Sequence, residues 1–156
     1  MTSLTPEQLN ARLITTEKKG VRIGDLIGRP LVLAFFPAAF TSVCTAELCG
    51  FRDNSARLNG LNAQVYGISI DLPATLSVFA EQNGLNFPLL SDCNREAIRA
   101  FDVVWPLLWD IVRDVANRAI FIIDGDGRIV YRWVAEKPGN VPPFDEVFAT
   151  LDGGQS

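Results

Sequence analysis

The sequence predicts an α/β domain with a central mixed β-sheet flanked by helices, because strand-like and helix-like segments alternate along the chain. Two continuous apolar runs of strand length, residues 30–36 and 63–70, are each followed by a segment with helical periodicity. Residues 118–133, RAIFIIDGDGRIVYRW, contain two β-rich runs joined by DGDG, which indicates a hairpin. We therefore expect a sheet that is parallel at the crossovers and antiparallel at the hairpin.

The first strong element is PLVLAFF, residues 30–36, whose unbroken apolar character predicts a strand buried on both faces of the sheet. From Val43 onward the spacing of apolar residues becomes helical, and Gly60 ends the run. One face of this predicted helix holds Leu48, Phe51, Ser55 and Leu58. Cys44 is therefore expected at a strand-to-helix junction.

The later elements continue the alternation. AQVYGISI, residues 63–70, predicts a second buried strand, and LPATLSVFAEQNG predicts a helix that ends at its glycine. DCNREAIRAF predicts a short helix that Asp92 or Asn94 starts. PPFDEVFATL, residues 142–151, predicts a final helix with proline at its start.

Residues 102–117, DVVWPLLWDIVRDVAN, resist assignment because they carry two tryptophans around a proline. We expect a loop with a helical turn here. Large apolar side chains are buried by default, so we expect core or an active-site wall, with a partner surface as the alternative.

Composition indicates one domain over residues 1–156, since 48% of the 156 residues are hydrophobic and no Gly- or Ser-rich linker divides the chain. Three cysteines are too few, and odd in number, for a disulfide framework, so we expect a cytoplasmic protein.

The longest apolar run, residues 30–40, is far short of the roughly 20 residues that span a bilayer. The net charge is −4 and Lys18-Lys19 is the only adjacent basic pair. We expect neither a membrane nor a nucleic-acid partner.

The chain has no histidine, which removes Ser-His-Asp and Cys-His enzymes and histidine zinc sites. The three cysteines lack C-x-x-C spacing, IIDGDG fails the calcium-loop pattern and no phosphate-binding glycine loop occurs. We expect no metal and no cofactor. Any cysteine chemistry must be activated by something other than an imidazole.

Cys44 is the candidate nucleophile, because Thr41 or Ser42 as N-cap places it in the first helical turn, where free N–H groups favour a thiolate. Lowering a thiol pKa from about 8.5 to about 6 raises its ionised fraction at neutral pH about thirtyfold, which alone does not make an efficient enzyme. Candidate donors to a bound substrate are the Thr41 hydroxyl and Arg118 at a strand entrance, with Pro37 shielding the pocket. The alternatives are an inert packed cysteine and a solvated arginine.

PAAFTSVC, residues 37–44, matches the P-x-x-x-T-x-x-C pattern of the peroxiredoxins. The longer segment FFPAAFTSVCTAELCGFRD resembles the active-site segment of their bacterioferritin-comigratory-protein (Q-type) branch, and the similarity covers residues 31–133. The resemblance implies a thioredoxin-like fold with peroxiredoxin insertions. The N-terminal LNARLITTEKKGVRIGDLIG departs from the A-P-D-F segment of many members, which leaves the first strands undefined.

The resemblance also implies roles for individual residues. Cys44 falls on the peroxidatic cysteine, which attacks a peroxide oxygen and becomes a sulfenic acid. Thr41, Arg118 and backbone N–H groups then bind the two peroxide oxygens, and Pro37 falls on the loop proline. Glu47 matches an acidic position of the segment, where it orients Arg118 or caps the helix.

Cys49 occupies the place of a resolving cysteine in the Q-type branch. Residues five apart in a helix have Cα atoms roughly 8–9 Å apart, beyond the limit of about 7 Å for a disulfide, so closure to Cys44 requires the first turn to unwind. In the alternative, Cys49 is a small buried residue and the enzyme uses one cysteine. Cys93 is expected to be a bystander thiol, with a resolving role as the lesser alternative.

The resulting expectation is a thiol-dependent peroxidase that reduces hydrogen peroxide and small organic hydroperoxides. Its expected partner is a thioredoxin-like or other dithiol reductant, with the chain as monomer or homodimer. A one-cysteine peroxiredoxin with an external resolving thiol is one alternative. A thioredoxin-type disulfide reductase is disfavoured by the missing C-x-x-C. A non-catalytic thioredoxin-like binding module would use the surface around Trp105 and Trp109.

Overall fold

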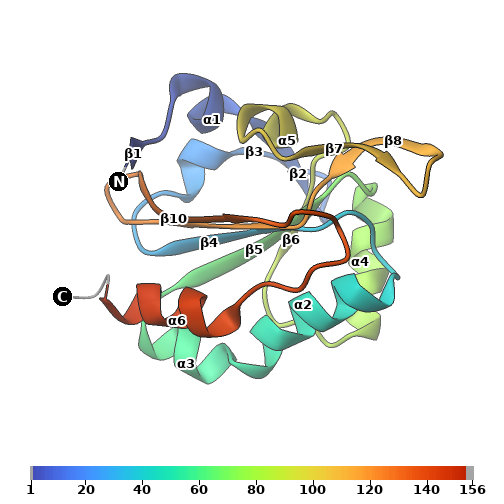
Figure 1. Cartoon of the computed structure of the whole chain (residues 1–156). Helices are drawn as coiled ribbons and strands as arrows, with labels where there is room; N and C mark the ends of the chain where they lie inside the picture. Colours follow the sequence, from blue (N-terminus) through green and yellow to red (C-terminus); the bar gives the residue numbers. More distant parts are fainter. Residues whose placement is uncertain (1, 154–156) are drawn as a thin grey trace.

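A computed structural model describes residues 2–153 of the chain, with the backbone alone described for residues 42–45. An eight-stranded sheet lies at its centre, in the order β1-β10-β9-β4-β5-β6-β2-β3 (Figure 1). The sheet strands are β1 (Thr2–Ser3), β2 (Arg12–Thr15), β3 (Gly20–Arg22), β4 (Leu31–Phe35), β5 (Gln64–Ser69), β6 (Leu89–Ser91), β9 (Ala119–Ile123) and β10 (Arg128–Val134). A separate hairpin is formed by β7 (Val104–Leu108) and β8 (Val112–Ala116). The helices are α1 (Pro6–Asn10), the 3₁₀ helix η1 (Ile23–Leu26), α2 (Ser42–Asp53), α3 (Ser55–Gly60), α4 (Pro73–Gln82), α5 (Glu96–Ala100) and α6 (Phe144–Gly153).

The predicted central strand is confirmed as β4, whose five residues are all fully buried. It pairs in parallel with β5 and antiparallel with β9, so the sheet is mixed as predicted. The strand predicted at residues 63–70, the hairpin of β9 and β10 and the C-terminal helix are also confirmed. The N-terminal region that the sequence left undefined is an antiparallel pair of β2 and β3 at one edge of the sheet.

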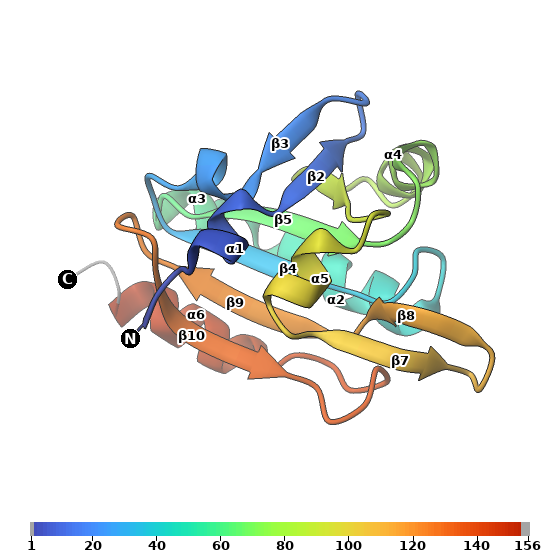
Figure 2. The same cartoon turned by 90° about the horizontal axis from the view of Figure 1, so that it is seen from above.

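Helices cover both faces of the sheet. In Figures 1 and 2, α2, α3, α4 and α6 lie on one face, and α1 and α5 lie on the other. Side chains of β4 alternate between the two cores: Val32 and Ala34 pack with the first helix group, and Leu31 and Leu33 with the second. This period of two lets one continuously apolar strand serve two cores.

The single helix predicted from residue 43 to Gly60 is wrong in one respect, because the structure divides it at Asn54 into α2 and α3. The Asn54 side chain donates a hydrogen bond of 2.7 Å to the Gly50 carbonyl, and its backbone leaves helical geometry. An asparagine side chain competes in this way with the helical backbone. The predicted apolar face survives the break, since Leu48 and Leu58 are both buried.

Residues 102–117 form the β7–β8 hairpin, so the expected loop with a helical turn is wrong. Trp109 and Asp110 both have positive φ angles, 56° and 59°, and the Ile111 N–H donates to the Leu108 carbonyl. Two consecutive left-handed residues are what a type I′ hairpin turn requires. The usual Asn-Gly marker of such a turn is missing here, and the hairpin projects beyond the sheet in Figure 2.

The prediction that Asp92 or Asn94 starts the short helix α5 is wrong for the N-cap, which is Arg95 with a left-handed φ of 62°. Asp92 still binds the first turn of this helix through its side chain. Its carboxylate accepts hydrogen bonds of 3.0 and 2.8 Å from the N–H groups of Ala97 and Ile98. Burial raises the pKa of Asp92 to about 6, although these two bonds oppose the rise. A buried carboxyl therefore satisfies two N–H groups of the first turn of α5.

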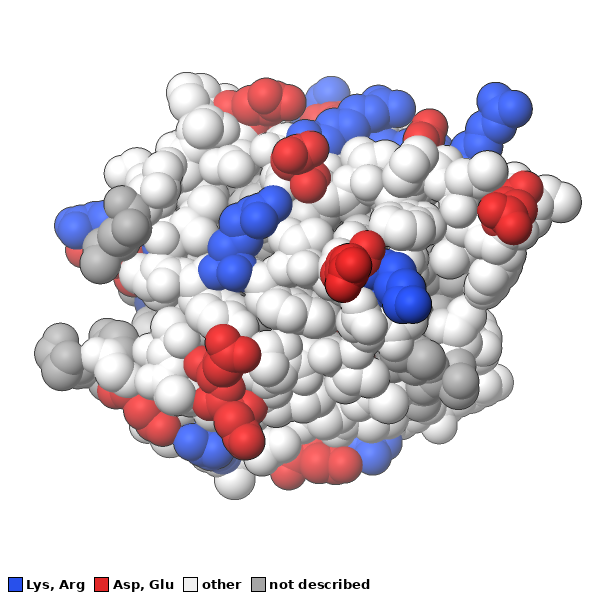
Figure 3. Space-filling model, viewed as in Figure 1, with Lys and Arg blue, Asp and Glu red and all other residues white. Residues whose placement is uncertain are grey.

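The charged surface is mixed in sign. On the face that Figure 3 shows, basic side chains are scattered among acidic ones and form no continuous stripe. Among the residues that the structure describes, no helix is long and apolar enough to cross a bilayer.

Candidate active site

The pairing of β4 with β9 brings the predicted site residues to one edge of the sheet. Phe35, the last residue of β4, lies directly opposite Ala119, the first residue of β9. Because the strands are antiparallel, the loop that follows β4 and the residue that precedes β9 meet at this edge. That loop is residues 36–41, and the preceding residue is Arg118.

The loop enters α2 with Thr41 as the N-cap, one of the two residues predicted for that position. The Thr41 hydroxyl donates a hydrogen bond of 3.1 Å to the Ala38 carbonyl. Phe40 has a φ angle of 68°, which is uncommon for a residue with a large side chain. Its ring packs edge-on against Phe79 of α4 at 5.1 Å between centroids, and this contact helps to hold the strained loop.

Cys44 is the third residue of α2, so its backbone lies in the first helical turn, as predicted. Its side chain lies outside the described part of the structure. A cysteine in the first turn of a helix is favoured as a thiolate, because the N–H groups there have no partner within the helix and stabilise an anion.

Arg118 is buried, with its side chain only 2% exposed. Its Nε donates a hydrogen bond of 2.9 Å to the Pro138 carbonyl, and its Nη1 lies 3.5 Å from Glu47 Oε1. Two contacts from different segments therefore fix the plane of the guanidinium at the edge where Thr41 lies. The sequence predicted the place of Arg118 at a strand entrance but gave no sign of Pro138.

Glu47 lies in the second turn of α2, is fully buried and faces Arg118. Its position and this contact favour the orienting role over the helix cap that was the other expectation. Among the described residues, Glu47 Oε2 has no hydrogen-bond partner. Burial raises the pKa of Glu47 to about 8, and Arg118 opposes this rise. Burial prevails because one oxygen is unpaired and the other is 3.5 Å from Arg118.

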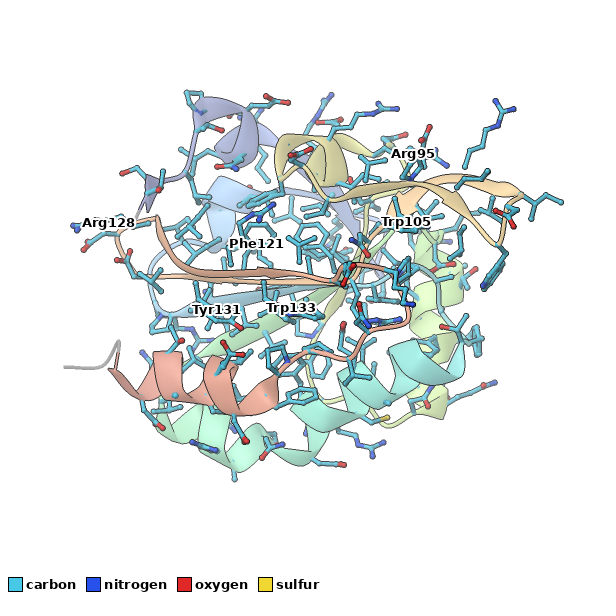
Figure 4. All side chains as sticks on the ribbon, viewed as in Figure 1. Arg95, Trp105, Phe121, Arg128, Tyr131 and Trp133 are labelled. Atoms are coloured by element: carbon cyan, nitrogen blue, oxygen red, sulfur yellow. The ribbon has the colours of Figure 1, made fainter. Side chains whose placement is uncertain are left out.

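A pocket of about 380 Å³ opens between the loop and the hairpin. Three predicted residues line it, namely Pro37, Thr41 and Arg118. The remaining lining is Trp105, Leu107, Leu108, Trp109, Asp110, Lys137, Pro138 and Gly139. Figure 4 labels Trp105 near the end of the sheet from which the hairpin projects. The two tryptophans therefore form part of a pocket wall, one of the two uses that we expected for this segment.

The remaining two cysteines are free thiols and half-buried. Cys49 lies in α2, five residues after Cys44 in the same helix. Cys93 lies between β6 and α5. Within the described part of the chain, no group of three or more histidine, cysteine or acidic side chains is arranged to hold a metal ion.

The sequence profile described as the AhpC/TSA family matches residues 7–132 of the chain. The chain belongs to this family. It is 40% identical over 111 residues to Peroxiredoxin Bcp of Escherichia coli (strain K12), which covers 70% of each protein. It is thus a peroxiredoxin, and its activity is that of a thiol peroxidase, which takes a peroxide as substrate and a thiol as reductant.

Solved structures agree in fold. A mutant of Xylella fastidiosa PrxQ superposes with a TM-score of 0.85 at 28% identity, covering 99% of this chain and 95% of that one. Peroxidoxin BcpB from Mycobacterium tuberculosis superposes with a TM-score of 0.81 at 29% identity, covering 98% of both chains. The thioredoxin-like peroxiredoxin fold that the resemblance implied is therefore confirmed, as is its Q-type branch.

Proposed function

We propose that Cys44 is the peroxidatic nucleophile and that Thr41 and Arg118 bind its peroxide substrate. The observation that carries this proposal is the meeting of Thr41, Arg118 and Pro37 in one pocket beside the first turn of α2. The turn and the Arg118 charge both favour a thiolate at Cys44. Burial raises the pKa of Glu47, so its carboxyl neutralises less of that charge than an ordinary ionised glutamate would.

The first step is nucleophilic displacement at oxygen. The Cys44 thiolate forms an S–O bond to the terminal oxygen of R–O–O–H while the O–O bond breaks. Sulfur loses two electrons and becomes a sulfenic acid, and the leaving alkoxide takes a proton to become R–O–H. The substrates are hydrogen peroxide (R is hydrogen) and small organic hydroperoxides.

Thr41 and Arg118 act on different atoms in this step. The Thr41 hydroxyl donates its own proton to the Ala38 carbonyl, so its oxygen is oriented to accept a hydrogen bond from the peroxide O–H. The Arg118 guanidinium donates to the oxygen on which negative charge develops as the O–O bond breaks. The stabilisation grows during the step, as transition-state binding requires.

The second step is resolution by Cys49. Its thiolate attacks the Cys44 sulfenic sulfur, the S–S bond forms, and hydroxide leaves and is protonated to water. Both residues lie in α2, so the first turn of this helix must unwind before the two sulfurs can meet. Cys93 takes no part in this scheme, and a one-cysteine cycle with an external thiol is its competitor.

The reductant is a thioredoxin-like or other dithiol protein, which restores both cysteines by thiol–disulfide exchange. We propose that residues 1–156 act as one domain, as monomer or homodimer, in the cytoplasm. The support for this location is chemical, because such a compartment keeps the dithiol donor reduced.

The test is peroxide consumption with a dithiol present, measured for the parent chain and for Cys44→Ser, with Cys93→Ser as the matched control. Consumption by the parent and by Cys93→Ser, with loss in a folded Cys44→Ser variant, supports the proposal. Continued turnover by Cys44→Ser would contradict the assignment of the nucleophile. Equal loss in Cys93→Ser would contradict its bystander role.

A further inference from the structure

Asp71 follows β5 and joins three parts of the protein. Its Oδ2 accepts a hydrogen bond of 2.8 Å from the Ala39 N–H, within the loop that carries Thr41. The same oxygen accepts a hydrogen bond of 2.7 Å from the Ser69 hydroxyl. On its main-chain side, the Asp71 carbonyl accepts a hydrogen bond from the Ser91 hydroxyl of β6.

The two serines are buried, with Ser69 fully inaccessible and Ser91 only 1% exposed. Buried hydroxyls must find partners, and the Ser69 hydroxyl donates to the carboxylate oxygen that also accepts the Ala39 N–H, so this bond fixes that oxygen. The Ser91 hydroxyl reaches only the main-chain carbonyl of Asp71. Asp71 does not line the pocket. Its Oδ2 instead fastens Ala39, which lies two residues before Thr41.

Two further contacts of the loop, residues 36–41, are also made with β5 and with α4, the elements on either side of Asp71 in the sequence. The Phe36 N–H donates a hydrogen bond of 2.9 Å to the Ile68 carbonyl of β5. The Phe40 ring, on a backbone held at positive φ, packs against Phe79 of α4. The segment from β5 to α4 therefore determines the position of the loop. Asp71, which lies between these two elements, contributes a side-chain hydrogen bond to the loop at Ala39.

We propose that Asp71 is a positioning residue for peroxide reduction, which holds through Ala39 the loop that orients Thr41 and begins α2. This inference rests on the proposed role of Thr41 at the Cys44 site. A displacement of about 1 Å at a reacting centre can lower a rate about a hundredfold, so a remote anchor of this kind matters for the rate.

The experiment measures the second-order rate constant for oxidation of the reduced protein by hydrogen peroxide. Stopped-flow tryptophan fluorescence suits this chain, because Trp105 and Trp109 line the pocket. Asp71→Ala, which removes the acceptor, is expected to lower the rate constant about tenfold or more. Asp71→Asn is expected to stay within about threefold of the parent, because one amide oxygen can replace the single oxygen that accepts both bonds.

Asp71→Glu separates position from charge. It keeps the negative charge but moves the oxygens by one methylene, so an anchor that works by position predicts impairment. A result in which Asp71→Glu is normal and Asp71→Asn impaired would overturn the proposal in favour of a charge effect. These two variants also decide the question if Asp71→Ala fails to fold.

Ser91→Ala is the matched control, because it removes a buried hydrogen bond from the same corner without touching the Asp71 carboxylate. It should lower thermal stability and leave the rate constant unchanged. If it slowed oxidation as much as Asp71→Ala does, a general structural role would replace positioning.

The double variant Asp71→Ala/Thr41→Val tests whether Asp71 acts through Thr41. The inference is supported if the double variant loses far less in rate constant than the product of the two single fold-losses. It is contradicted if the double variant loses the full product, because the two residues then act independently. The same measurement separates failure of the proposed function from failure of this inference. If the role of Thr41 is wrong, the rate constant of Thr41→Val will equal that of the parent. If only the role of Asp71 is wrong, Thr41→Val will be slow and Asp71→Ala will react at the parental rate.

Discussion

Replacing Glu47 by glutamine removes a buried titrating group while nearly keeping its size and shape. Glu47 is fully buried, and burial raises its pKa from 4.5 to about 8 against the opposing effect of Arg118. In the unfolded chain its pKa returns to about the ordinary value. The folded protein therefore binds more protons than the unfolded chain between these two values.

The sign and size of the effect on stability follow from this difference. A carboxyl whose pKa is raised by folding contributes stability that is fully present below pH 4.5 and is lost as the pH rises through about 8. The pKa of Glu47 differs between the folded and unfolded states by 8 minus 4.5, or about 3.5 units. At about 1.4 kcal/mol per unit, the free energy of unfolding decreases by about 5 kcal/mol in all across this range. Glu47→Gln has no such loss.

The assay is urea unfolding of the reduced parent and of Glu47→Gln at several pH values between about 5 and 8. The free energy of unfolding of the parent, relative to the variant, should fall by about 1.4 kcal/mol per pH unit. Asp92, whose pKa is also raised, is present in both proteins and cancels in the comparison. A difference that stays constant, or that grows in favour of the parent with rising pH, would show that Glu47 is ionised beside Arg118 and would refute the reasoning.

Three further substitutions address the site. Thr41→Val should slow oxidation by peroxide about a hundredfold, since it removes an oriented hydroxyl, and a parental stopped-flow rate would exclude that role. Arg118→Lys should slow it at least about tenfold, because one ammonium cannot bind Pro138 and the substrate together as the guanidinium does; unchanged kinetics would indicate a structural arginine. Cys49→Ser should leave Cys44 as a sulfenic acid that overoxidises readily. Mass spectrometry checks this, and parental resistance to overoxidation would remove Cys49 from the cycle.

Much of the fold could be predicted because its elements have local causes. The unbroken apolar run at β4 and the DGDG turn between β9 and β10 both depend on residues close in sequence. Two local predictions were wrong for local reasons as well. The Asn54 side chain bonds to Gly50 and breaks the helix, and the β7–β8 turn takes its left-handed pair from Trp109 and Asp110.

The candidate site was only partly predictable. The position of Cys44 in a first helical turn follows from the neighbouring residues, and the place of Arg118 follows from its strand. The hydrogen bond of Arg118 to Pro138 joins residues 20 positions apart, and the hydrogen bond from Ala39 to Asp71 joins residues 32 positions apart. Contacts of this kind depend on how distant segments pack, which no local pattern encodes.

The central claim is that the Cys44 thiolate is the group that peroxide oxidises. It is tested most directly by treating the reduced protein with one equivalent of hydrogen peroxide, alkylating the remaining thiols and mapping the three cysteines by mass spectrometry. The account predicts that Cys44 is the first to lose its free thiol, as a disulfide with Cys49 or, in Cys49→Ser, as a sulfenic acid. A Cys44 that is still fully alkylated after the peroxide has been consumed would contradict it.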